Sequence, residues 1–190
     1  MRSAVPLALI GVVVVLATGC GGDGGQNAEP AQPLVPPAKT QQEWARRLTT
    51  RFLNPVENDL RIINLLSSPT TLLYLYEGNS ETLSTVKQRM NDLQFCSYKL
   101  ARVGAPPSGA PKLATITTSF RQACVQYERL AGLVLQAVPL LASEDPAKKK
   151  RGRTVFSQAA EPSRLAAKHY GRAVHAIERD RTLRHLILGG

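Results

Sequence analysis

The sequence lacks the motifs that identify many small enzymes. It has no glycine-rich phosphate loop, no Gly-x-Ser-x-Gly, no Cys-x-x-Cys and no His-Glu-x-x-His. Aromatic residues make up only 5 % of the 190 residues, and 14 acidic residues face 24 Lys and Arg, for a net charge of +10. With 20 % charged and 43 % hydrophobic residues, a disordered chain and a polytopic membrane protein are both disfavoured. We therefore expect one basic globular domain that is not an enzyme and holds no cofactor.

The chain also lacks an apolar run long enough to remain in a membrane. Its longest run, Ala8 to Thr18, rises about 16 Å as a helix, against roughly 30 Å for a hydrocarbon core. It follows Met1 and Arg2, which give a short positive start. This order is typical of a secretory signal that is removed.

The residues after this run are Leu16-Ala17-Thr18-Gly19-Cys20. They resemble the lipobox of bacterial lipoproteins, with Ala17 where a Leu is commonest. The resemblance implies that residues 1–19 are cleaved off, that the Cys20 thiol receives a diacylglyceryl group, and that the protein is extracytoplasmic and held on a bacterial membrane through Cys20. Two or three acyl chains hold a protein almost permanently, whereas one does not. The alternative is an ordinary secretory signal with an incidental cysteine.

Residues 20–39 have the composition of a tether. Gly21 to Gly25 contain four glycines, and a mixture of Pro, Ala and Gln follows up to Pro36-Pro37. Such a segment buries little and behaves as a linker, flexible at its glycine end and stiffer at its proline end.

Residues 40–190 show helical periodicity nearly everywhere, which predicts an all-α, irregular antiparallel bundle of four or more helices. Asn54 is placed as the N-cap of a helix that restarts at Pro55. Pro139 is expected to kink or end its helix. Residues 69–77 fit either a short helix or a strand. The other expected helices cover residues 41–53, from the cap at Ser80 to 102, from 111 onward, and 162–186.

Once Cys20 is assigned to the anchor, Cys96 and Cys124 remain. Both lie about 40° from the apolar stripes of helices joined by a short proline-rich turn, so a disulfide is predicted. In a symmetric hairpin they would be about 9 Å apart along the axis, beyond the ~7 Å limit, so the second helix must begin higher than the first ends. Two buried free thiols are the alternative.

Basic residues gather toward the C-terminus. Arg164, Lys168, Arg172, His175 and Arg179 recur every three or four residues, which places them on one helix face. Ahead of them, residues 148–153 are expected to form a flexible basic loop. We predict contact with an anionic partner through Lys148, Lys149, Lys150, Arg151, Arg153, Arg164, Lys168, Arg172 and Arg179, although a merely solvated face explains the same pattern.

The sequence therefore predicts a non-enzymatic interaction or structural module of the cell envelope. Its partner would be an anionic lipid, a cell-wall polymer or an envelope protein, and nucleic acid is disfavoured by the compartment. The alternative is a helical lipoprotein that binds a small ligand or a metal. His175 and Glu178 form a His-x-x-Glu that resembles the Gly-x-His-x-x-Glu of imelysin-type envelope proteins, with Ala173 at the glycine position. Two ligands do not make a zinc site, so no metal is predicted.

Overall fold

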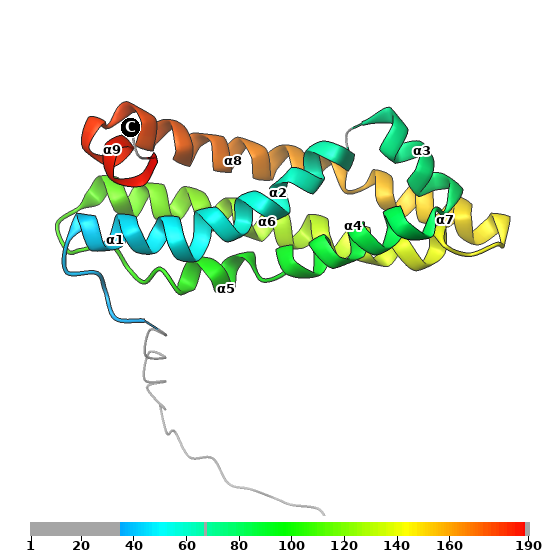
Figure 1. Ribbon diagram of the computed structural model, residues 1–190, viewed down its shortest axis with the longest axis horizontal. Helices are drawn as coiled ribbons and strands as arrows, with labels where there is room; N and C mark the ends of the chain where they lie inside the picture. The colour runs from blue at the N-terminus through cyan, green and yellow to red at the C-terminus, as the bar shows by residue number, and fades with distance from the viewer. Residues whose placement is uncertain (1–34, 67, 189–190) are drawn as a thin grey trace, which may run out of the picture. The chain divides into compact units, whose positions relative to one another are not determined.

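A computed structural model describes residues 35–66 and 68–188. These belong to one compact unit, Pro33–Gly190. The expected signal peptide, Cys20 and most of the expected tether lie outside the described residues. Within the described ranges every regular element is a helix, which confirms the all-α bundle (Figure 1).

The first helical segment runs without interruption from residue 41 to residue 66. It comprises α1 (Gln41–Leu48), a π-helical turn η1 (Thr49–Leu53) and α2 (Asn54–Leu66). Asn54 has helical angles, φ −60° and ψ −46°, so the prediction that it caps a new helix is wrong. The wider π turn accommodates Pro55, which has no N–H to donate to the preceding turn.

The next helices settle the alternative left open for residues 69–77. Helix α3 (Pro69–Glu77) forms there and ends at Gly78, whose φ of 85° suits glycine. Helix α4 (Ser80–Leu93) is capped by the side chain of Asn79, not by Ser80, and its last turn is followed by a break at Gln94 and Phe95. The expected single helix to residue 102 is therefore two helices, the second being α5 (Cys96–Ala101).

Helix α6 (Pro111–Leu141) is the centre of the bundle. Helices α4, α5, α7 (Pro146–Ser157) and α8 (Ala160–Arg179) all pack on it. Pro139, which was expected to kink or end its helix, lies in the last turn of α6, which continues two residues further to Leu141. The Phe120 ring meets Phe52 at 5.1 Å and Tyr170 at 5.4 Å, both edge to face, so it joins α6 to η1 and α8.

The last expected helix is also divided. Asp180 leaves α8 with extended angles, and its carboxylate accepts the backbone N–H groups of Thr182 and Leu183, both at 3.2 Å. It thereby caps α9 (Arg181–Leu188), which packs on α1. The chain thus returns to the end of the bundle where α1 begins (Figure 1).

Candidate functional site

The face of α8 that points away from α6 carries the predicted cations. The side of α8 that packs on α6 is formed by Ala166, Ala173 and Ile177, none more than 1 % exposed. The two alanines are small and let α8 lie close to α6. The opposite side is exposed, as the spacing predicted. We call it the basic face, and it consists of Arg164, Lys168, Arg172, His175 and Arg179.

Small residues between these cations leave a shallow hollow of about 550 Å³. Ala167, Gly171 and Ala176 lie along it, and a methyl group added at Gly171 would meet nothing within 4 Å. The long cationic side chains therefore stand on both sides of an open surface.

The cations of the basic face differ in whether they already have partners. Arg164 forms two hydrogen bonds with Glu161, at 2.7 and 2.8 Å, and the pKa of Glu161 is lowered by this contact. His175 Nδ1 lies 2.9 Å from Glu178 Oε2. Among the described residues, none forms a hydrogen bond or ion pair with the side chains of the other three, Lys168, Arg172 and Arg179.

Residues 148–153 lie inside α7, so the expectation of a flexible loop is wrong. Asp145 caps the helix by accepting the Ala147 N–H at 2.8 Å, and Pro146 occupies the first turn. The start of α7 was not recognised in the sequence, because a charged stretch with a glycine resembles a loop. Gly152 is buried where α7 approaches Leu140 and Leu141 of α6.

Two of the five predicted cations of α7 are engaged with α3. Lys149 donates to the Glu77 carbonyl at 3.2 Å, and Arg153 donates to the Tyr76 carbonyl at 3.5 Å. Arg153 also lies over the Tyr76 ring, 5.5 Å from its centroid. Cations suit the carbonyl end of a helix, so these two side chains join α7 to the end of α3.

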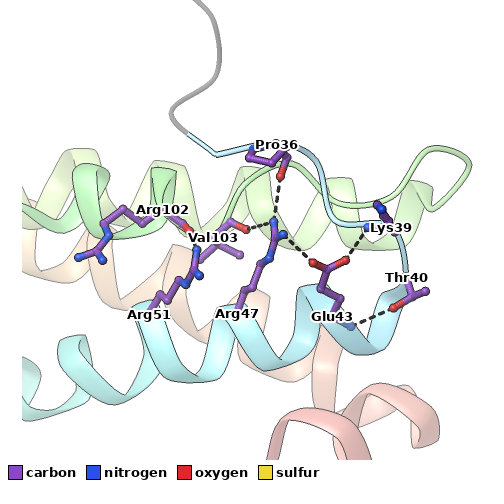
Figure 2. Close-up of polar contacts among 8 residues, drawn as sticks. All are labelled: Pro36, Lys39, Thr40, Glu43, Arg47, Arg51, Arg102 and Val103. Atoms are coloured by element: carbon purple, nitrogen blue, oxygen red, sulfur yellow. Dashed lines mark hydrogen bonds and ion pairs between the residues drawn. The ribbon is translucent and has the colours of Figure 1, made fainter.

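The segment leading into α1 is fastened to the bundle, a contact that the expectation of a free tether did not include (Figure 2). Arg47 donates to the Pro36 carbonyl at 2.8 Å and to Glu43 at 2.6 Å, and it reaches the Val103 carbonyl at 3.5 Å. Ala38 is 3 % exposed and donates its N–H to the Ala105 carbonyl at 2.9 Å. We call this set of contacts the tether clamp. It holds residues 36–38 against the loop after α5.

Glu43 completes the tether clamp. Its carboxylate accepts the Lys39 N–H at 2.8 Å, and this bond, with the Arg47 guanidinium, holds the Glu43 pKa below its ordinary value of 4.5. An i, i+4 Glu–Arg pair on one helix is a signal that sequence inspection could have found.

The predicted disulfide is present. Cys96 and Cys124 are bonded, with their Cα atoms 5.1 Å apart and both residues fully buried. Because Cys96 is the first residue of α5, after the break at Gln94, the register of α5 against α6 differs from that of a symmetric hairpin. The bond joins the short helix α5 to α6.

An apolar pocket lies between α2, α3, α6 and the α7–α8 junction. Its volume is about 310 Å³, it is half open to solvent, and its lining includes Leu66, Leu72, Tyr76, Leu130, Val134 and Phe156. Its polar lining is limited; Ser157, for example, already donates to the Thr154 carbonyl at 2.8 Å. Sequence reasoning missed this pocket, because it is formed by residues from five helices.

Metal binding and acid–base chemistry by tyrosine have little support in the described part of the chain. No three His, Cys, Asp or Glu side chains there are grouped to hold a metal ion, and the pair His175 and Glu178 has no third ligand. Burial raises the pKa of Tyr170 to about 12 and also raises that of Tyr127, so both phenols are weaker acids than an ordinary tyrosine.

Comparison with known proteins gives no relative: no family model, curated protein or solved structure matches this chain. Among the described helices, none combines the length and the apolar character that a membrane crossing requires.

Proposed function

We propose that this is a lipid-anchored cell-envelope protein whose bundle acts as a non-enzymatic interaction module. In this proposal Cys20 carries the anchor, and the basic face of α8 binds an anionic envelope component. The observation that carries it is the set of exposed cations Lys168, Arg172 and Arg179, which have no partner among the described residues and flank an open hollow.

The tether clamp suits an anchored protein. It fixes the start of the bundle at residues 36–38, so about 14 residues separate Cys20 from Val35 and span at most about 50 Å. Lys112, at the start of α6, pairs with Asp180 at 3.2 Å, which places the end of α8 beside the start of α6. The basic face runs from there for about 22 Å along α8.

The expected binding free energy of the basic face is small, but it is sufficient to orient a protein that a lipid anchor already holds at the surface. A Lys or Arg near an anionic surface contributes about 1 kcal/mol, so three contribute about 3 kcal/mol. That corresponds to a dissociation constant weaker than millimolar for a free protein. An anchored protein is already concentrated at the surface, so the same energy decides how the bundle lies on it.

The test uses the full lipidated chain in vesicles of neutral phosphatidylcholine, with or without 30 % phosphatidylglycerol. Hydroxyl-radical labelling of α8 should fall in the anionic vesicles. The triple variant Lys168→Glu, Arg172→Glu and Arg179→Glu should abolish this protection. The matched control reverses three exposed cations elsewhere, Arg46→Glu, Lys87→Glu and Arg129→Glu, which changes the net charge equally.

A soluble anionic polymer added to the neutral vesicles separates the two kinds of partner. Protection by the polymer alone identifies a cell-wall polymer as the better partner, and protection by phosphatidylglycerol alone identifies the lipid. Equal labelling of α8 under every condition, or equal loss of protection in the control variant, refutes the basic face as the contact surface.

The anchor has its own test. Cys20→Ser should abolish incorporation of labelled fatty acid and processing by the lipoprotein signal peptidase. Unchanged fatty-acid labelling and unchanged processing in this variant would show that residues 16–20 are not a lipobox.

A further inference from the structure

We propose that the apolar pocket between α2, α3, α6 and the α7–α8 junction binds the acyl chain of an anionic amphiphile, with its headgroup beside Arg153. Among the described residues, the pocket shares no lining residue with the hollow of the basic face, so this inference does not depend on the function proposed for that face.

The lining explains why an acyl chain is the expected occupant. Leu66, Leu130, Val134 and Phe156 give the pocket apolar walls, and the Ser157 hydroxyl already has a backbone acceptor. Such a site gains little from binding water, whereas an apolar group that enters it loses contact with solvent.

The size of the pocket sets the length of the chain. A cavity of about 150 Å³ holds benzene, so the 310 Å³ present here accommodates about 12 carbon atoms. Because the pocket is half open, one end of the chain can remain at the surface. This shape suits a molecule with an apolar tail and a hydrated head.

No charged side chain of the described residues lines the pocket, but two cations of α7 lie beside the pocket residue Tyr76 and favour a negative head. Tyr76 lines the pocket and meets Phe156 edge to face at 5.9 Å, and the Arg153 guanidinium lies over the same Tyr76 ring. The contact of Arg153 with the Tyr76 carbonyl is long, 3.5 Å, and uses one of five N–H donors. Lys149 adds a second cation, which donates to the backbone carbonyl of the adjoining Glu77, whose own carboxylate is exposed. A carboxylate or phosphate placed here would meet charged donors on a short arc of α7.

The first experiment measures chain length. The full chain, held in amphipol, is photolabelled with straight-chain carboxylic acids of 8 to 16 carbons that carry a terminal diazirine. Each buried methylene strengthens binding about fourfold, so half-saturation should improve about 15-fold for each two carbons added. The improvement should stop near 12 carbons, and the label should appear on α6 near Leu130 and Val134.

The second experiment uses matched variants. Ala160 lines the pocket at the first turn of α8, so Ala160→Trp should fill it and abolish labelling. Ala167→Trp, at a position that lines the hollow of the basic face instead, should leave labelling unchanged. Should the Ala160 variant lose its helical circular dichroism, Ser163→Phe fills the same pocket from the next turn.

The third experiment tests the charge of the head. Amine probes with the same tails should bind at least fivefold more weakly than the acids. Arg153→Gln should remove most of this difference, and Arg151→Gln, an exposed neighbour without a partner among the described residues, should preserve it. The proposal is overturned by label spread over the surface at every chain length, by equal labelling in the filled-pocket variants, or by equal affinity for the two heads.

Discussion

Replacing Gly152 by Ala tests the packing of α7 on α6. A methyl group at this position would lie 3.0 Å from Leu140 Cβ, 3.0 Å from Leu141 Cγ and 3.1 Å from Leu141 Cδ2. Leu140 Cβ moves only with its backbone, so rotation of a side chain cannot relieve that contact. The close approach of the two helices therefore favours glycine at residue 152.

Two opposing effects decide the size of the change. Alanine is the better helix former by about 1 kcal/mol, and overpacking a closed contact costs about 1–3 kcal/mol. Gly152→Ala should therefore lower the free energy of unfolding by about 1 kcal/mol. The matched control is Gly171→Ala in α8, where the added methyl group has nothing within 4 Å. That variant gains the helix propensity alone and should be more stable by up to about 1 kcal/mol.

The assay is urea unfolding of the parent and the two variants, followed by far-ultraviolet circular dichroism. The slope with urea should be the same in all three, so the midpoints report stability directly. The two variants should differ by about 2 kcal/mol, with the parent between them. If Gly152→Ala is as stable as Gly171→Ala, residues 148–153 are not packed against α6, and the sequence-based expectation of a loop is restored.

Three further predictions concern the contacts that hold the bundle together. The Cys96–Cys124 disulfide closes a loop of 28 residues, and its reduction should lower the free energy of unfolding by about 3.6 kcal/mol in the chain-entropy model. With a slope of about 2 kcal/mol per M urea, the midpoint should fall by about 1.8 M; a shift below about 0.5 M would contradict this. The Asp59 side chain is 4 % exposed and lies 2.7 Å from the Lys99 ammonium. Asp59→Ala leaves that ammonium with the Asp92 carbonyl as its acceptor and should lower the free energy of unfolding by about 3 kcal/mol in the same assay; the double replacement with Lys99→Met should recover most of this loss. Because the folded-state pKa of Glu43 is depressed, the stability that it contributes is present above its ordinary value of 4.5 and is lost as the pH falls through the lower folded pKa. Carbon-13 NMR should therefore show its carboxyl titrating below 4.5, and a normal titration would mean that the tether clamp is open in solution.

The helical class of the fold could be predicted because the apolar spacing is a local property. Leu83, Val86, Met90 and Leu93 follow the spacing of three and four residues, and all are buried in α4. The disulfide was predictable for the same reason, since both cysteines lie beside such stripes. Periodicity says which face of a helix is buried, and it says little about where one helix stops.

The breaks in the helices depend on side chains that compete with a continuing backbone. Asp180 ends α8 because its carboxylate caps the next helix. At the end of α4, Lys99 of α5 donates to the Asp92 carbonyl at 3.0 Å while it pairs with Asp59 of α2. The Lys99–Asp59 pair joins residues 40 positions apart. It can be known only once the chain is folded, so a window of sequence predicts one long helix where there are two.

The same limit applies to the count of available charges. Nine cations were predicted to contact an anionic partner. Three of them, Lys149, Arg153 and Arg164, already have partners in the structure. The six others divide between α7 and α8, and those on α8 are the stronger candidates for a docking surface. Lys168, Arg172 and Arg179 are four and seven residues apart on a helix held to α6 by buried Ala and Ile side chains, so their backbone positions are fixed before a partner arrives. Fixed charges lose less conformational entropy on binding. The cations left on α7, Lys148, Lys150 and Arg151, are also held in a helix, but their spacing of two and one residues spreads them around it, whereas the spacing on α8 keeps its three cations on one face.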